Sequence, residues 1–455
     1  MTHTTFGRPE TGTVAHRLQR SIGGHVYLPG DERYDDERRA LLPNLDPRPA
    51  VVVGAAGTSD IQAAVRVARS YDLPFAVQAT GHGTRVSADG GILLKTAAMA
   101  SVLVDPDRRI ARVGPGARWA QVLAAAASFG LAPLSGSSPS VGVTGYTLGG
   151  GIGWLGRRFG LAADSVVRAE VVDADGRLIT ATPEGHPDLF WALRGGGASF
   201  GVVTSLEFRL HPVNQVYGGI SYFSIERAAE TLQRYRDWAA AAPDELSTAV
   251  LLTRLPDAQH IPEALRGRRA IAIKAMHSAG HAAAAEKALK PLLDGAGPAL
   301  WDGYQTMRYA DAAMGGTAAR YLDFFDTLPN AAIDSMVAAA GSEDAPVTTI
   351  EIRHWAGAIT HSGPNTGPAG HRGSPFSVIV DTPTRELTAS LSGAGTGGTF
   401  LNFLGDVTRT ASAFTPANYR RLREIKAAYD PDNFFRVGHN IPPSATAALA
   451  RRAAG

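Results

Sequence analysis

Residues 75–91 read FAVQATGHGTRVSADGG and place one histidine, His82, between two glycines. Glycines without side chains let a backbone approach a ligand closely. A neutral imidazole is a nucleophile and a proton acceptor. A solvated turn histidine explains this loop equally well, so the loop alone leaves both interpretations open.

The glycine loop follows the second strand of an expected strand–helix–strand unit. Val51 to Val53 form a short apolar run, which indicates a buried strand. Thr58 or Ser59 is suited to cap a helix with an apolar stripe of Ile61, Val65 and Ala68. The second strand is PFAVQ, and such a unit predicts a parallel pair.

The flanking chain extends this unit to one α+β domain over residues 49–212. A polar helix is expected near 31–42. Strands are expected at 101–105, 109–113 and 175–181, and a helix at 117–130.

Beyond residue 212 the pattern indicates a second α+β domain with an antiparallel sheet. Strand candidates at 270–277, 348–355 and 376–382 alternate with helix candidates at 226–241 and 280–293, and 361–375 reads as a loop. Thr415 and Pro416 then begin a helix that ends at 430–433.

Composition narrows the class of protein. The chain has 455 residues, 44% of them hydrophobic, with a formal net charge of +2 and no cysteine. Disulfides and cysteine nucleophiles are therefore excluded, and neither nucleic acid nor an anionic membrane is an expected partner. The first 20 residues lack the apolar stretch of a signal peptide, so we expect a cytoplasmic protein.

Glycines gather at 81–91, 135–160 and 195–201. Gly151, Gly153 and Gly156 match the dinucleotide pattern G-x-G-x-x-G, but no clean strand precedes them, so we reject a Rossmann site. Glycine turns beneath packed strands are the plainer interpretation. Three such loops that converge would instead cradle the pyrophosphate of a large flat cofactor, and FAD fits that description.

Four stretches, at 79–96, 135–178, 186–212 and 418–443, resemble the FAD-linked oxidases of the vanillyl-alcohol-oxidase superfamily, in particular the berberine-bridge-enzyme-like family. The resemblance covers residues 45–215 and 400–443. It implies a two-domain α+β fold of the PCMH type, with a substrate domain built on an antiparallel sheet covered by helices. We expect an FAD domain at 1–213, a substrate domain at 214–404 and a C-terminal segment at 405–455 that returns to the FAD domain.

The resemblance also implies the cofactor site. His82 takes the position of the histidine that forms an 8α bond to the flavin. Further cofactor-binding positions are Gln78, Ala79, Thr80, Gly81, Gly83, Thr84, Ser138, Val141, Gly142, Gly145, Tyr146, Gly150, Gly151, Gly201, Val202, Val203, His439 and Asn440.

Three departures from the family pattern change the expected chemistry. Ser138 replaces a cysteine that attaches the flavin a second time in many relatives, so we expect a single bond through His82. Val141 takes the position where valine is associated with oxidases, which favours O2 as electron acceptor. Phe400 and Phe403 replace the usual tyrosine base.

The strand at 348–355 supplies the remaining catalytic candidates. Alternation places Glu351 and Arg353 on one face and His354 on the other. Arg353 is always protonated, so it can bind a substrate anion but cannot be the base. Glu351, His354 and Tyr146 are the acid/base candidates. A solvated surface Glu–Arg pair is the alternative.

We therefore expect an FAD-dependent oxidase that takes hydride from a small, natural-product-like molecule in secondary metabolism. The alternatives are a sugar or alcohol oxidase of the same family and a flavin-binding protein without activity. His277 and His281 lack a third ligand, so no metal site is expected. A homodimer is one candidate assembly.

Overall fold

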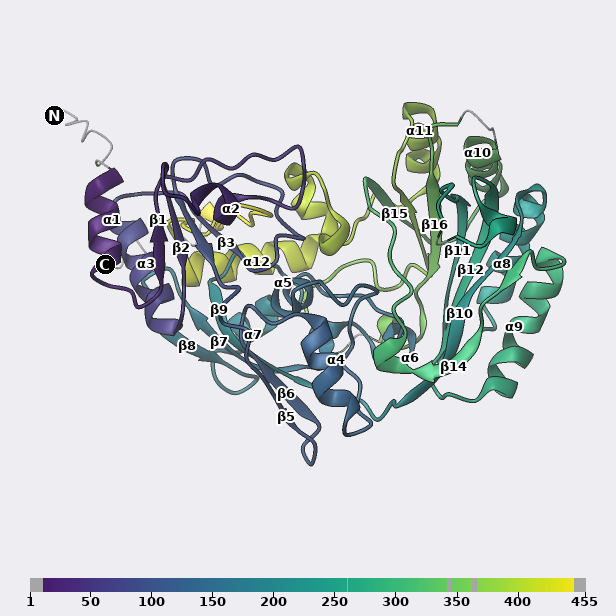
Figure 1. The fold of residues 1–455 in the computed structure, drawn as a ribbon, viewed down its shortest axis with the longest axis horizontal. Helices are drawn as coiled ribbons and strands as arrows, with labels where there is room; N and C mark the ends of the chain where they lie inside the picture. The colour runs from purple at the N-terminus through teal and green to yellow at the C-terminus, as the bar shows by residue number, and fades with distance from the viewer. Residues whose placement is uncertain (1–10, 260, 342–344, 362, 364–365, 446–455) are drawn as a thin grey trace.

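The computed structural model describes residues 11–259, 261–341, 345–361, 363 and 366–445. It contains three sheets, two in the N-terminal half and one in the C-terminal half (Figure 1). The first sheet has four strands in the order β1-β2-β4-β3, namely His25–Tyr27, Val51–Gly54, Ile92–Lys95 and Phe75–Gln78. Helices α1 (Thr11–Gln19), α2 (Tyr34–Arg38) and α3 (Thr58–Ser70) belong to the same region.

Two local expectations in this region need correction. Strands β2 and β3 run in the same direction, but they do not pair, because β4 lies between them and is parallel to both. Helix α3 has Gly57 at its N-cap with no side-chain hydrogen bond, so neither Thr58 nor Ser59 caps it. The polar helix expected near 31–42 is only the five-residue α2.

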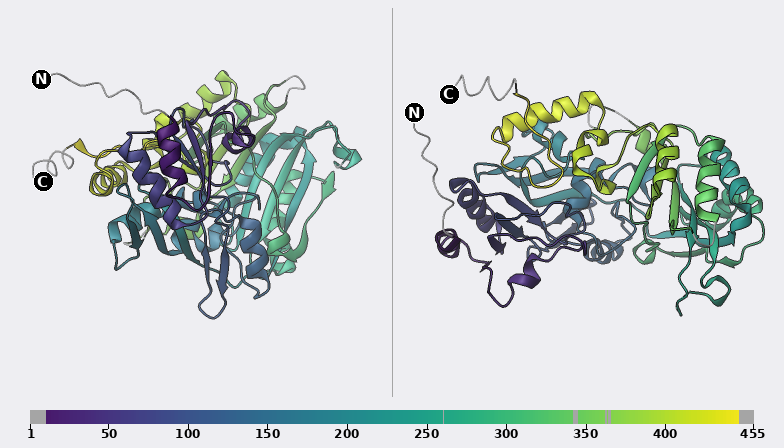
Figure 2. Two further views of the ribbon diagram at one scale, coloured as in Figure 1. Left: turned by 60° about the vertical axis from the view of Figure 1, so that its left-hand side comes forward. Right: turned by 90° about the horizontal axis from the view of Figure 1, so that it is seen from above.

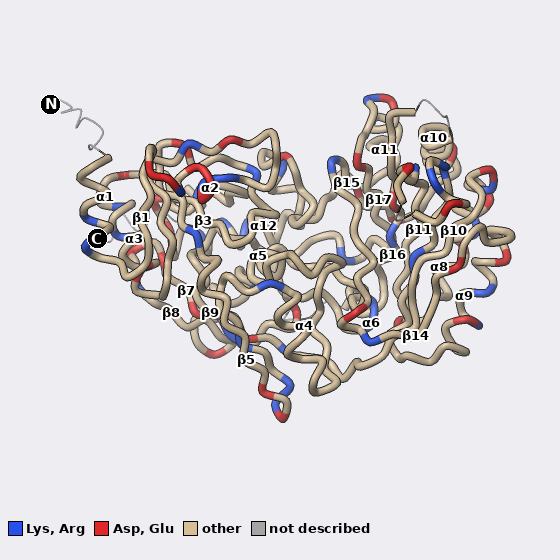
Figure 3. The backbone as a smooth tube through the Cα atoms, in the orientation of Figure 1, with Lys and Arg blue, Asp and Glu red and all other residues tan. Residues whose placement is uncertain are grey.

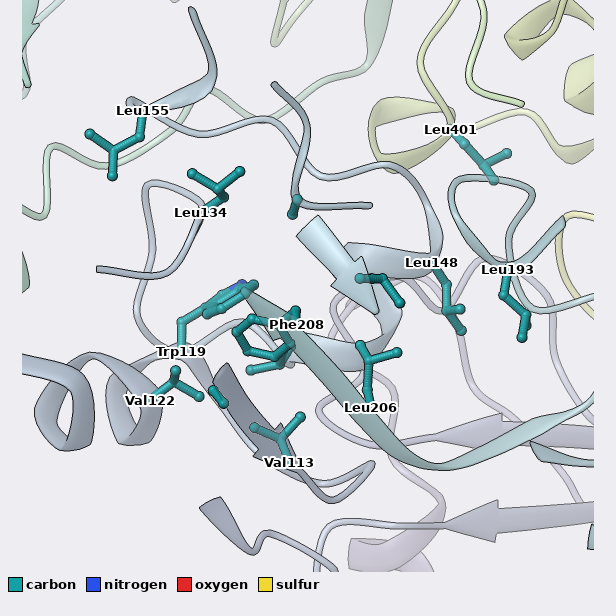
Figure 4. Packing of buried hydrophobic residues seen from close by; sticks show 14 of the residues in the cluster. Val113, Trp119, Val122, Leu134, Leu148, Leu155, Leu193, Leu206, Phe208 and Leu401 are labelled. Carbon is teal, nitrogen blue, oxygen red and sulfur yellow. The ribbon is translucent and has the colours of Figure 1, made fainter. Parts of the chain in front are cut away.

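The second sheet is antiparallel, with the order β5-β6-β9-β7-β8, namely Val102–Asp105, Ile110–Val113, Val202–Arg209, Val166–Val172 and Leu178–Ala181. Its helices are α4 (Trp119–Ala127), α5 (Val143–Leu148), α6 (Gly156–Phe159) and α7 (Pro187–Leu193). Trp119 and Phe208 meet edge to face in the core beside this sheet (Figure 4), with ring centroids 5.9 Å apart.

The third sheet forms the C-terminal half. Its order is β13-β10-β12-β11-β16-β17-β15, namely Trp301–Asp302, Gln215–Ser224, Arg269–His277, Leu246–Arg254, Thr349–His354, Phe376–Val380 and Tyr321–Phe325, while β14 (Gln305–Arg308) also pairs with β10. Every pairing is antiparallel. The antiparallel sheet expected beyond residue 212 is confirmed.

Helices cover one face of this sheet. These are α8 (Ala228–Ala239), α9 (Ala282–Ala296), α10 (Asn330–Gly341) and α11 (Arg385–Ala394), which lie on the outer side of the molecule in Figures 1 and 2. Ile350 and Ile352 of β16 pack into the core beneath them. Because side chains alternate along a strand, Glu351 and Arg353 point to the opposite face, toward the N-terminal half.

The last helix, α12 (Pro416–Tyr429), returns to the N-terminal half and packs beside α7 (Figure 1). Thr415 caps it by accepting a hydrogen bond from the amide of Asn418, as the sequence predicts. Basic and acidic residues are interspersed along the backbone of both halves (Figure 3), in keeping with the nearly balanced composition.

Candidate functional site

A cavity of about 430 Å³ lies where the glycine-rich loops, the C-terminal segment and the third sheet meet. Most of the residues expected at a cofactor site line it. They are Gln78, Ala79, Thr80, Gly81, His82, Gly83, Thr84, Ser138, Val141, Gly142, Gly145, Tyr146, His439 and Asn440, together with Arg353 from the third sheet. Segments more than 300 residues apart in the chain thus share one wall, as His82 and His439 illustrate.

Five expected cofactor residues do not line this cavity. Gly150 and Gly151 have φ values of +108° and +74°, and they pack beneath the loop against Phe400 and Tyr146. Gly201 packs against β7, and the side chains of Val202 and Val203 enter two hydrophobic cores. The wall is formed instead by residues 197–199, which lie just before β9.

Sequence reasoning also missed part of the lining. The additional residues include Arg85, Gly149, Ile152, Gly197, Ala198, Ser199, Gly316, Thr317, Ile379, Leu401, Asn402 and Arg436. The glycine clusters signalled Gly149 and Gly197. Nothing local signalled Gly316, Thr317 or Ile379, because only the packing of the two halves brings them to the cavity.

His82 stands at this cavity with its ring held on both sides. Its Nδ1 lies 3.0 Å from the Thr80 hydroxyl, and its Nε2 lies 3.4 Å from the Ser140 hydroxyl. Partial burial, helped by Arg118, lowers the pKa of His82. The imidazole is therefore neutral near pH 7, and a neutral imidazole has a lone pair available for nucleophilic attack.

Several polar atoms that border the cavity lack a partner within the described part of the chain. They are Gln78 Oε1, the Tyr146 hydroxyl, His439 Nδ1 and Asn440 Oδ1. A buried polar group without a partner costs about 1–3 kcal/mol, so these atoms indicate a ligand with hydrogen-bonding groups of its own. The isoalloxazine, ribityl and adenine groups of FAD carry such groups, so the residues present fit FAD.

Asn402 organises the loop that faces the cavity. Its amide nitrogen donates to the Tyr146 carbonyl at 2.9 Å, and its amide oxygen accepts from the Gly151 amide at 2.9 Å. A Cβ atom at Gly149 would lie 2.6 Å from the same side chain, so only glycine fits there. The glycine at position 149 in the 135–160 cluster is therefore explained by its close contact with Asn402, which comes from the C-terminal half.

Tyr146 is poorly suited to act as a base. Burial raises the pKa of its hydroxyl well above the usual value, with Tyr309 adding to that effect and Arg353 opposing it. The phenol therefore stays protonated near neutral pH and can donate a hydrogen bond. Phe403 lines the cavity without any titratable group, and Phe400 is buried against Trp355.

Glu351 and Arg353 form a buried ion pair, so the surface pair considered as an alternative is wrong. Arg353 Nε donates to Glu351 Oε1 at 2.8 Å, and Arg353 Nη2 lies 2.6 Å from the same oxygen in the ion pair. Glu351 has no exposed surface, and Arg353 is 8% exposed. Burial alone would raise the pKa of Glu351, but Arg353, Lys274 and the Thr317 hydroxyl together lower it. Glu351 therefore lies ionised behind Arg353 and does not line the cavity.

His354 faces away from the cavity, so it is not positioned as an acid or base there. The pleat of β16 turns its ring toward Phe376, with ring centroids 5.7 Å apart. Its Nε2 lies 2.8 Å from Nη1 of Arg157. Burial, and secondly Arg157, lower the pKa of His354 to about 3.

The described residues contain neither a metal-binding cluster nor a membrane-spanning helix. No group of three histidine, aspartate or glutamate side chains there could hold a metal ion. In the same part of the chain, no helix is both long enough and apolar enough to cross a bilayer.

A cavity built from glycine loops of an α+β half and closed by an antiparallel sheet defines a two-part FAD-binding oxidoreductase. A family model described as an FAD binding domain matches residues 49–182, and one described as berberine and berberine like matches 399–442. The chain is 30% identical to (R)-6-hydroxynicotine oxidase of Paenarthrobacter nicotinovorans, over 93% of this chain and 97% of that protein.

Solved structures agree with this assignment. The crystal structure of 6-hydroxy-D-nicotine oxidase from Arthrobacter nicotinovorans superposes with a TM-score of 0.81 at 26% identity, covering 93% of this chain and 99% of that one. A chitooligosaccharide oxidase shares the fold with a TM-score of 0.82 at 21% identity, over 96% and 100%. The protein belongs to the berberine-bridge-enzyme-like family of FAD-linked oxidoreductases.

Proposed function

We propose that the protein is an oxidase that holds FAD through a single covalent bond to His82 and oxidises a small, natural-product-like molecule with O2 as the acceptor. The observation that carries this proposal is the convergence on one cavity of the His82 loop, the C-terminal segment and four buried polar atoms that have no partner among the described residues. When bound, FAD supplies the redox chemistry, taking up a hydride from the substrate and passing electrons to O2.

The chain's own residues would bind FAD and the substrate, orient them and polarise the reacting groups. His82 is neutral and would provide the attaching nitrogen, while Ser138 would leave the second attachment unmade. Residues 1–213 and 405–455 would form the cofactor domain, and 214–404 the substrate domain. Gln78 and Asn440 would offer hydrogen-bond acceptors to the cofactor. Val141 lines the cavity and would leave room for O2.

A sugar or alcohol oxidase is the second candidate, since a chitooligosaccharide oxidase shares the fold. The cavity offers little for it: Phe403 lines the wall, Phe400 is buried, and neither can take a hydroxyl proton. A homodimer, a cytoplasmic location and a role in secondary metabolism remain predictions.

Anaerobic mixing of the purified protein with candidate substrates tests the proposed function. A substrate should bleach the flavin absorbance, and admission of air should restore it with release of peroxide. A protein whose flavin is bleached by dithionite but by no substrate would favour a flavin-binding protein without activity. A purified protein without flavin that also fails to take up added FAD would contradict the proposal outright.

A further inference from the structure

The charges around the cavity are unbalanced. Among the described lining residues are three arginines, Arg85, Arg353 and Arg436, and no aspartate or glutamate. Arg85 belongs to the His82 loop and Arg436 to the C-terminal segment, so both come from the part that would hold the negatively charged pyrophosphate. Arg353 comes from the opposite wall, on the third sheet.

Arg353 belongs to a buried group of three charged side chains. Glu351 pairs with Arg353, and Lys274 of β12 lies on the same face of the sheet and acts on Glu351 electrostatically. Lys274 is 8% exposed and donates to the carbonyl of Met314 at 3.0 Å. Two cations against one carboxylate leave this group with one uncompensated positive charge. Arg353 lines the cavity, so an anion bound there would compensate this charge.

The guanidinium of Arg353 is fixed in place and has one end free. Its Nε donates to Glu351 Oε1, its Nη2 lies 2.6 Å from the same oxygen, and its Cζ lies 5.4 Å from the centroid of the Trp154 ring. Its Nη1 makes no hydrogen bond in the described part of the chain. Glu351 is in turn held by the Thr317 hydroxyl, which donates to Oε2 at 2.6 Å. A planar donor group held in this way is well suited to an oxyanion.

We propose that the substrate is an organic anion whose carboxylate or ionised enol or phenol group binds to Arg353, with Glu351 and Lys274 as positioning residues. This inference rests on the proposed function for the identity of the reaction, but not for the binding of the anion. An ionised enol or phenol also suits a cavity whose wall carries Phe403 where a tyrosine base is expected, since such a group has already lost the proton that a base would remove. Glu351, held in an ion pair behind Arg353, does not act as that base.

The test measures binding by calorimetry on the purified protein, with benzoate and 4-nitrophenolate as anionic probes and benzamide as the neutral match. We expect benzoate or 4-nitrophenolate to bind at least about tenfold more tightly than benzamide, since hydrogen bonds to charged groups are worth about 1.5–3 kcal/mol. The tighter of the two anions distinguishes a carboxylate from a phenolate substrate. Equal binding of all three probes would overturn the proposal.

The variants Arg353→Gln and Glu351→Gln are expected to differ in their affinity for the anionic probes. Arg353→Gln should weaken anion binding roughly ten- to hundredfold and leave benzamide unchanged. Glu351→Gln keeps an amide oxygen that can accept from Arg353 Nε and so hold the guanidinium in place, but it removes the compensating negative charge, so anions should bind as tightly as in the wild type or more tightly. Weaker anion binding in Glu351→Gln, or unchanged anion binding in Arg353→Gln, would contradict the charge balance argued here.

Calorimetry does not require flavin, so a protein that prefers benzoate but neither contains FAD nor takes up added FAD would contradict the proposed function alone. The wild-type comparison of benzoate with benzamide needs no variant, so the proposal stays testable if Arg353→Gln does not fold.

Discussion

At the scale of the residue, His82 is the position with the most specific expected chemistry. Its neutral ring, held by Thr80 and Ser140, is ready to attack, but the bond itself remains a prediction. We expect acid-precipitated wild-type protein to stay yellow and His82→Ala to lose its colour to the supernatant. His439→Ala removes the other histidine of the cavity wall and should keep the colour in the pellet. A yellow pellet from His82→Ala would exclude His82 as the attachment residue.

At the scale of the element, helix α12 fixes two walls of the cavity through one buried ion pair. Lys426 donates to Asp430 at 2.6 Å and to the carbonyls of Ser199 and Phe435 at 2.6 and 3.0 Å, and neither charged side chain has exposed surface. Lys426→Met would leave Asp430 buried without its cation, at a cost of about 3–5 kcal/mol. We expect a lower melting temperature and a lower ratio of bound flavin to protein.

The matched control on the same helix is Arg420→Met, since Arg420 is exposed. Its melting temperature and flavin content should stay close to those of the wild type, because surface substitutions usually change stability by less than about 0.5 kcal/mol. A Lys426→Met protein with wild-type stability would show that the ion pair does not hold the two walls.

At the scale of the whole molecule, Arg157 joins the two halves and makes their contact sensitive to acid. From α6 it donates to the carbonyls of Ala242, Leu246 and Trp355, and its Nη1 lies 2.8 Å from His354 Nε2. The pKa of His354 is about 3 in the folded protein, below its usual 6.5. The contribution of the neutral His354 ring to the unfolding free energy is therefore complete above about pH 6.5. It is lost as the pH falls toward 3, since in this range the unfolded chain binds a proton at His354 and the folded protein does not.

This linkage predicts that the unfolding free energy decreases by about 2–3 kcal/mol between pH 6.5 and 4.5 on account of His354 alone. Denaturant unfolding at the two pH values measures it. His354→Gln keeps a hydrogen-bonding group without titrating, so its decrease should be smaller by a similar amount. The same pH dependence in the variant and the wild type would assign the effect to other groups.

The sequence by itself determined what is local or carried by long motifs. Alternation along 348–355 correctly placed Glu351 and Arg353 opposite Ile350 and Ile352, because the two faces of a strand differ by a single residue step. Capping chemistry located the start of α12. The glycine clusters and the family resemblance identified an FAD-binding protein without any coordinates.

Only the tertiary structure decided which of these residues share the cavity. Sequence spacing cannot tell whether a charged pair is solvated or buried, since burial depends on what packs against the strand, and so the ion pair of Glu351 and Arg353 became visible only in three dimensions. The same holds for β4 between β2 and β3, and for Gly316 and Thr317, which a distant loop brings to the wall. Long-range packing determines the positions of these residues, so no local sequence pattern predicts them.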